Sequence, residues 1–242
     1  MIGTLLNVAG ILVGGAAGLL RCKVLPVATE AYIKIVLAAF TVFCGLRLTW
    51  LSLGGSIGQV TKQILVLVVA LMLGKLTGRL LRLQKISNRL GRAAQERLAG
   101  GAVRKETRLS AAFKTCTVLY CVAPLGIIGA VVEGLSTANN FYPLALKAVM
   151  DGLATMGLVL ALGWGVLLSA IPVLALQGTI NILCSRLLQP FLLTHGLSDS
   201  VNAVAGMLVF SVALIMLGLK RIEVADYLPG LVVAPVLTWI FA

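Results

Sequence analysis

Residues 75–114 read KLTGRLLRLQKISNRLGRAAQERLAGGAVRKETRLSAAFK, and they hold eleven of the 20 Lys and Arg residues in the chain. Most of the sequence on either side is apolar. Hydrophobic residues make up 60% of the chain and charged residues only 12%, whereas soluble domains contain about 25% charged residues. Several apolar runs reach the roughly 20 residues that a helix needs to cross a bilayer. We therefore predict an all-α, polytopic transmembrane helix bundle with the basic stretch in one loop.

The apolar runs predict about eight membrane-spanning helices. Their approximate limits are 2–20, 33–53, 62–82, 110–132, 148–171, 173–193, 200–219 and 226–242. The fifth and sixth are separated only by Ile171-Pro172, because proline interrupts a helix and disfavours a helical residue before it. The segment 173–193 either spans the membrane or re-enters it, and the sequence leaves both open.

The distribution of charge predicts the orientation. Cytoplasmic loops carry an excess of Lys and Arg, which places 83–109 in the cytoplasm, with the 21–32 turn that contains Arg21 and Lys23. The connections 54–61, 133–147 and 194–199 and both termini are then outside. The same bias accounts for the net charge of +12 without a nucleic-acid partner. Apolar residues recur at helical spacing within 83–109, so we expect a basic amphipathic helix there, with anionic lipid as a candidate partner.

The two ends of the chain contain similar motifs. Gly3-Thr4 and Asn7 match Gly178-Thr179 and Asn181, and Gly45-Leu46-Arg47 matches Gly218-Leu219-Lys220. The predicted orientation makes these copies run in opposite directions, as in many secondary transporters. We therefore expect one membrane domain, 1–242, made of a first repeat unit (1–82), the basic loop (83–109), a middle helix pair (110–172) and a second repeat unit (173–242). Chance recurrence of short motifs in a Gly-rich apolar sequence is the alternative.

Polar side chains within the spans are the candidate site residues. A charge at the bilayer centre costs about 2.5–3.5 kcal/mol on insertion scales, so a retained charge usually has a partner or a function. Lys147 and Asp151 share one helix face, which predicts either a carboxylate that gates a cation or proton, or a structural ion pair. The other candidates for a substrate or ion pathway are Asn7, Gln177, Thr179, Asn181 and Glu133. We expect Glu133 at the membrane interface, and interhelical hydrogen bonds would explain the amides equally well.

Nothing in the sequence indicates an enzyme or a bound cofactor. It contains no phosphate-binding loop, no HExxH, no GxSxG and no cluster of His and carboxylates. The five cysteines form no CxxC pair, so no metal site is expected. Gly10, Gly14 and Gly18 form a GxxxGxxxG stripe, which allows close helix packing within one chain or in a homo-oligomer.

One longer pattern resembles a known family. It runs from Lys147-Ala-Val-Met-Asp151-Gly152 through Leu162-Gly-Trp-Gly-Val-Leu-Leu-Ser-Ala-Ile-Pro172 to Gln177-Gly-Thr. Together with the opening Met1-Ile-Gly-Thr and the closing Gly218-Leu-Lys, it resembles the YqgA/YdfK family of bacterial inner-membrane proteins, catalogued as a domain of unknown function. Ala138-Asn139-Asn140 departs from the Gly-Asp turn that is common in that family. The resemblance covers nearly the whole chain and implies a multi-span protein of the bacterial inner membrane, with no established substrate.

These observations favour a small-solute or ion transporter in which Asp151 is the coupling carboxylate. Asn7 and Asn181 would contribute polar lining from the two repeat units. Two alternatives stay open: a membrane scaffold whose basic loop binds lipid or an acidic partner, and a passive channel.

Overall fold

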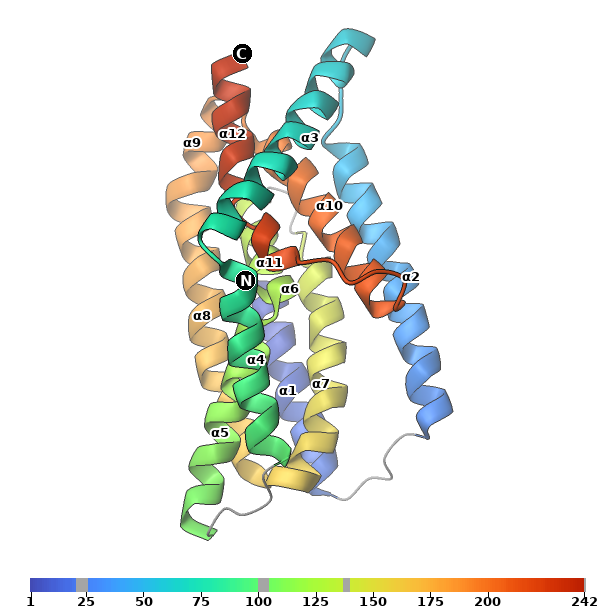
Figure 1. The fold of residues 1–242 in the computed structure, drawn as a ribbon, viewed down its shortest axis with the longest axis vertical. Coiled ribbons are helices and arrows are strands. Elements are labelled where there is room, and N and C mark those ends of the chain that lie inside the picture. Colours follow the sequence, from blue (N-terminus) through green and yellow to red (C-terminus); the bar gives the residue numbers. More distant parts are fainter. Residues whose placement is uncertain (21–25, 100–104, 137–139, 242) are drawn as a thin grey trace. The chain divides into compact units, whose positions relative to one another are not determined.

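The computed structural model describes residues 1–20, 26–99, 105–136 and 140–241, without the side chains at positions 27, 97–99 and 105–108. In this part of the chain the regular elements are helices and no strand occurs (Figure 1). Seven helices are long and apolar enough to cross a membrane, and a bent pair brings the number up to eight. The predicted all-α polytopic class is therefore confirmed. Arg21, Lys23, Ala138 and Asn139 lie outside the described residues.

The chain forms two compact units, and each unit draws on separate parts of the sequence. Unit 1 consists of Met1–Glu30, Ile86–Glu133 and Ala138–Ile182. Unit 2 consists of Ala31–Lys85, Gly134–Thr137 and Leu183–Ala242. The two predicted repeat segments, 1–82 and 173–242, thus each contribute their first helix to unit 1 and their remaining helices to unit 2.

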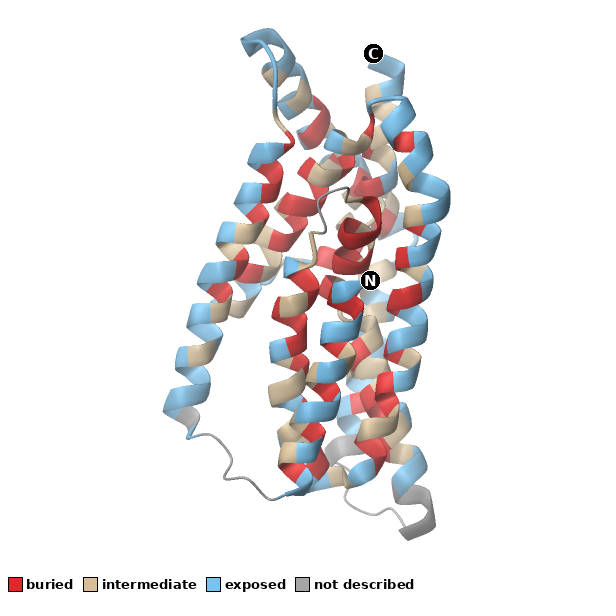
Figure 2. Ribbon diagram, turned by 180° about the vertical axis from the view of Figure 1, so that it is seen from behind, coloured by how far each residue is buried: buried red, intermediate tan, exposed pale blue. Residues whose placement is uncertain are grey.

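Unit 1 is built around a core of apolar side chains from five elements. It contains most or all of α1 (Ile2–Leu19), α4 (Leu83–Ala99), α5 (Lys105–Val122), α6 (Pro124–Leu135), α7 (Tyr142–Leu162), the 3-10 helix η1 (Trp164–Ser169) and α8 (Ala170–Leu183). The core includes Ile11, Cys116, Val159, Val166 and Val173. Buried and exposed positions alternate along the helices (Figure 2). Many exposed positions are large and apolar, as expected for helices that face lipid.

The glycine stripe of α1 packs directly against α7. A Cβ atom added at Gly10 or Gly14 would overlap the carbonyl oxygens of Ala148 and Gly152, and one at Gly18 would lie 2.6 Å from the Met156 oxygen. Small residues allow two backbones to approach this closely in a membrane protein. Residue numbers rise together along the contact, so α1 and α7 are parallel. The stripe is used within the chain and therefore gives no argument for a homo-oligomer.

The fourth predicted span, 110–132, is not one straight helix. It consists of α5 and α6, whose axes differ by 58°. The break lies at Ala123, because Pro124 has no amide hydrogen to donate to the preceding turn. The prediction of a single uninterrupted span was therefore wrong.

The predicted helix boundary at Ile171-Pro172 was also wrong. α7 starts at Tyr142, before the predicted 148, and ends at Leu162. Gly163 then adopts a φ of 86°, a left-handed conformation that glycine tolerates best. Pro172 instead lies in the first turn of α8, where its missing amide hydrogen breaks no intrahelical bond. The helical stretch Trp164–Thr194 is long and apolar enough to span a membrane, which favours a span over a re-entrant segment.

Unit 2 is held together by two antiparallel helix pairs. It contains most or all of α2 (Val27–Leu51), α3 (Ile57–Leu80), the π-helix η2 (Cys184–Leu188), α9 (Gln189–Thr194), α10 (Ser198–Met216), α11 (Val224–Tyr227) and α12 (Gly230–Phe241). In the first pair, α2 packs on α10. A Cβ atom at Gly45 would lie 2.6 Å from the Phe210 nitrogen, and Thr49 Oγ1 donates to the Ala203 oxygen at 3.2 Å.

The second pair brings α3 against α11 and α12. A Cβ atom at Gly74 would lie 2.6 Å from the Gly230 nitrogen, and one at Gly78 would overlap the Asp226 oxygen. Towards the other end of α3, Lys62 Nζ donates to the Phe241 oxygen. Residue numbers rise along α3 as they fall along its partner, so these helices are antiparallel.

The basic loop contains a helix, as predicted. α4 covers Leu83–Ala99 and follows Arg82, which has a φ of 55°. Ile86 and Leu90 are exposed one turn apart on this helix, and Arg89 and Arg92 are exposed beside them. Exposed apolar and basic residues on one helix are typical of helices that lie at a membrane surface.

We predict that Gly14→Val destabilises the protein by about 1–3 kcal/mol, the usual cost of overpacking a tight contact. Its side chain would collide with the Gly152 backbone and separate α1 from α7. Gly157→Ala is the matched control, because a Cβ atom there meets nothing within 4 Å. It should be neutral or stabilise α7 by up to about 1 kcal/mol. Unfolding of both purified variants in SDS–detergent mixtures measures the difference, and equal stabilities would contradict the packing described.

Candidate functional site

The structure buries the predicted ion pair inside unit 1. Lys147 and Asp151 lie one turn apart on α7, and their residues are only 2% and 8% exposed. Lys147 Nζ donates to Asp151 Oδ2 at 2.5 Å. The attraction between two buried charges only repays their loss of hydration when the geometry is good and further hydrogen bonds are made. The partners of the pair therefore decide what it can do.

Two amides from the other helices complete the surroundings of Asp151. Asn7 on α1 is fully buried, and its Nδ2 donates to Gln177 Oε1 on α8 at 3.2 Å. Asn7 also lies close to the Asp151 carboxylate. Its Oδ1 atom is buried and has no hydrogen-bond partner within the described structure. Buried polar atoms are rarely left unpaired in folded proteins, so this acceptor is available to a proton donor or a cation beside the carboxylate.

Tyr120 and Thr155 also belong to the site, although neither was among the predicted site residues. The Tyr120 hydroxyl and Thr155 Oγ1 are 2.7 Å apart, and Thr155 Oγ1 donates to the Asp151 backbone oxygen at 2.5 Å. Lys147 Nζ lies 5.9 Å from the centre of the Tyr120 ring, within the range of a cation–π interaction. Thr155 could have been found by extending the spacing of Lys147 and Asp151 by one more turn.

The break between α5 and α6 lies beside this cluster. A Cβ atom at Gly126, in the first turn of α6, would lie 2.9 Å from Lys147 Cε and 3.1 Å from Gln177 Nε2. The glycine therefore gives the lysine side chain room to reach Asp151. Interrupted helices in membrane proteins occur where the freed backbone groups are buried in protein or line a cavity, and in many transporters they mark the substrate site.

Glu133 is buried at the end of α6, at 7% exposure. Its Oε1 accepts from the Gly3 nitrogen at 2.6 Å, and its Oε2 accepts from the Thr4 nitrogen at 3.3 Å and from Asn181 Nδ2 at 2.9 Å. The Met1 amino group lies 3.2 Å from Oε1. The first amides of a helix lack intrahelical partners and carry partial positive charge. Glu133 therefore caps α1 and links it to α8, which is a structural role.

The predicted residues on α8 divide into two groups. Gln177 and Asn181 are buried one turn apart and bind Asn7 on α1 and Glu133 on α6, whereas Thr179 is exposed and does not join the cluster. We use the name polar cluster for Asn7, Tyr120, Lys147, Asp151, Thr155 and Gln177. Among the described residues no group of His, Cys, Asp and Glu has the arrangement of a metal site.

The polar cluster has the parts that a cation or proton site requires. Asp151 is a carboxylate that can bind a positive charge, and Lys147 is an internal cation that can pair with this carboxylate. The free oxygen of Asn7 adds a neutral acceptor next to them. A positively charged solute at Asp151 would compete directly with the lysine ammonium group.

Comparison with known proteins places the chain in a family. It is 29% identical to the uncharacterized protein YqgA of Escherichia coli (strain K12) over 97% of this chain and 94% of that protein. It is 25% identical to the uncharacterized membrane protein YdfK of Bacillus subtilis (strain 168) over 74% of this chain and 72% of that protein. No solved structure matches the chain. A family model described as a protein of unknown function (DUF554) matches residues 2–239, and the chain therefore belongs to the DUF554 family of membrane proteins.

Proposed function

We propose that this membrane protein transports a small solute or ion across the bacterial inner membrane. The observation that carries this function is the buried Lys147–Asp151 pair, which lies next to an interrupted helix and an unpaired Asn7 oxygen. A charge pair retained within a membrane domain usually serves an ion or proton pathway. Asp151 is the coupling carboxylate. It releases the Lys147 ammonium group when it binds a proton or a cationic group.

The antiparallel contacts between the two predicted repeat segments support this assignment. The first helices of the two repeat segments meet in unit 1, where Asn7 pairs with Gln177 and Gly15 lies against Leu167. Positions further along α1 therefore contact positions nearer the start of α8, so these two helices run in opposite directions.

The remaining helices of the two segments pair in the same way in unit 2. α2 runs antiparallel to α10, and α3 runs antiparallel to α12. Each helix of one segment thus contacts its counterpart in the other, which is the arrangement that an inverted repeat with a two-fold axis in the membrane plane would produce. Gly3 and Asn181, which bind the same Glu133 carboxylate, fit this relation, because their motifs correspond.

The topology that belongs to this function follows from charge. The 83–109 loop is cytoplasmic and both termini are outside. Unit 2 brings together parts of three segments assigned to the outer side, since the 54–61 and 194–199 connections and the end of α12 line one cavity. No enzymatic activity, cofactor or nucleic-acid partner is part of this function.

The test is flux into proteoliposomes across a panel of ions and metabolites, with and without a pH gradient. We predict that Asp151→Asn abolishes the flux that the wild type supports, because the neutral amide cannot exchange a proton or hold a cation. Glu96→Gln is the matched control, since Glu96 is exposed on α4, and it should transport normally. Wild-type flux in folded Asp151→Asn would refute the assignment, and flux that ignores the gradient would identify a passive channel.

A scaffold function has one observation in its favour. The exposed basic and apolar residues of α4 suit a surface of anionic lipid, where each Lys or Arg contributes about 1 kcal/mol. This contact is compatible with transport, because it involves the loop helix and no residue of the polar cluster. A folded protein that moves none of the panel solutes would leave the scaffold as the better explanation.

A further inference from the structure

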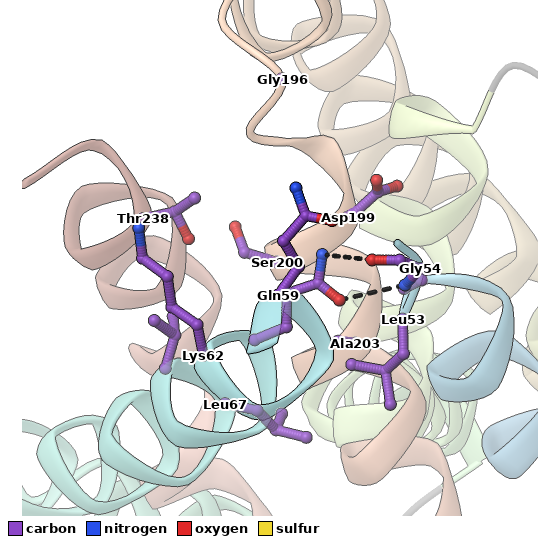
Figure 3. Close-up of a pocket in the computed structure, with 13 residues that line it drawn as sticks. Leu53, Gly54, Gln59, Lys62, Leu67, Gly196, Asp199, Ser200, Ala203 and Thr238 are labelled. Atoms are coloured by element: carbon purple, nitrogen blue, oxygen red, sulfur yellow. Dashed lines mark hydrogen bonds between the residues drawn. The ribbon is translucent and has the colours of Figure 1, made fainter. Parts of the chain in front are cut away.

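Unit 2 contains a cavity of about 300 Å³ that shares no residue with the polar cluster. It lies between the loop before α3, the first turns of α3 and α10, and the end of α12 (Figure 3). Its volume is at the lower limit for small-molecule sites in proteins. The lining segments belong to the side of the membrane that the charge distribution assigns to the exterior.

Two opposite charges line this cavity. Figure 3 shows Lys62 beside Thr238 on one side of the cavity and Asp199 on the other. Lys62 Nζ donates to the backbone oxygen of Phe241, and no carboxylate pairs with it within the described part. Asp199 makes neither a hydrogen bond nor an ion pair with any described residue. The two charges therefore do not neutralise each other, and each can bind a group of the opposite sign.

The other polar groups of the cavity are mostly occupied. Gln63 exchanges two hydrogen bonds with the Gly54 backbone. The hydroxyls of Ser200 and Thr238 donate to carbonyls of their own chain segments, so they can only accept further bonds. Lys62 and Asp199 are thus the groups that determine the charge of a ligand.

The inner wall of the cavity is apolar. Val66, Leu67 and Ala203 line it and are all buried, at 8%, 8% and 3% exposure. A ligand that fills the cavity would place an apolar group against these side chains, which stabilises binding in proportion to the area removed from water.

We propose that this cavity binds a small zwitterion with an apolar side group, of the chemical class of leucine. Its ammonium group pairs with Asp199, its carboxylate pairs with Lys62, and its side chain contacts Val66 and Leu67. A plain cation would leave Lys62 unpaired and would be repelled by it, and a plain anion would be repelled by Asp199. Binding here goes beyond the transport proposed for unit 1 and does not depend on it.

The test is calorimetric titration of the full-length protein in lipid nanodiscs, where binding is measured without transport. Leucine should bind, and 4-methylpentanoate and 3-methylbutylamine, which each lack one of its charges, should bind at least about tenfold more weakly. Lys62→Gln and Asp199→Asn should each weaken leucine binding by a similar factor. Lys220→Gln and Glu96→Gln, which change charges outside the cavity, should leave it unchanged, as should Asp151→Asn.

Several results would overturn this inference. One is the absence of leucine binding by folded wild-type protein, and another is binding that neither Lys62→Gln nor Asp199→Asn weakens. A response to phosphoethanolamine alone would assign the cavity to a lipid headgroup and not to a free solute. Leucine binding without any flux in proteoliposomes would uphold the cavity site while counting against the transport function.

Discussion

Lys147→Met is expected to lower the free energy of unfolding by about 3–5 kcal/mol, which is typical when one partner of a buried ion pair is removed. Lys147 is 2% exposed, and its ammonium group is bonded to Asp151. Without it the carboxylate keeps only neutral groups nearby, of which Asn7 is one. A buried carboxylate without a counter-charge is strongly unfavourable in a membrane domain. The loss can be measured by reversible unfolding of the purified protein in SDS–detergent mixtures.

The double variant Lys147→Met/Asp151→Asn separates stability from function. It carries no charge at either position of the pair, so most of the lost stability should return, to within about 1–2 kcal/mol of the wild type. Transport should remain absent, because no carboxylate is left to exchange a cation. Lys220→Met, which removes an exposed lysine, is the control and should change stability by less than about 0.5 kcal/mol. If the double variant were as unstable as Lys147→Met alone, the lost stability could not be attributed to the unpaired charge of Asp151.

Local features of this site could be predicted from the sequence, and long-range ones mostly could not. The shared face of Lys147 and Asp151 follows from helical spacing alone. The contact between Asn7 and Gln177 joins residues 170 positions apart, and only the repeated Gly-Thr motifs hinted that α1 and α8 belong together. Tyr120 gave no signal, because a tyrosine in an apolar run fits any buried position.

Helix boundaries depended on conformations that composition does not specify. Pro172 looked like a helix breaker, yet a proline in the first turn of a helix costs no hydrogen bond. Gly163 was one of many glycines, and only its φ of 86° marks it as the end of α7. Pro124 does interrupt a helix, although the hydropathy of the surrounding run alone indicated one continuous span.

Glu133→Ala is expected to destabilise unit 1 by at least about 3 kcal/mol, because it leaves three buried donors without an acceptor and each costs about 1–3 kcal/mol. The donors are the Gly3 and Thr4 amides and the Asn181 side chain. Glu133→Gln keeps one acceptor and should lose about half as much. Glu96→Ala, an exposed glutamate on α4, should change stability by less than about 0.5 kcal/mol. The measurement is the same unfolding titration.

Measuring both unfolding and flux also decides whether the buried Glu133 has a structural role or lies on the transport pathway. If Glu133 only caps α1 and links it to α8, Glu133→Gln should retain flux in proportion to the folded fraction, because the cap needs an acceptor and not a titrating group. A carboxylate on the transport pathway would behave differently, because its replacement would abolish flux even in the folded fraction, as proposed for Asp151→Asn. The inverted relation between α1 and α8 favours the first outcome. Glu133 binds Gly3 and Asn181, which belong to the matching motifs of the two segments, so the carboxylate fixes the contact around which the proposed repeats are arranged.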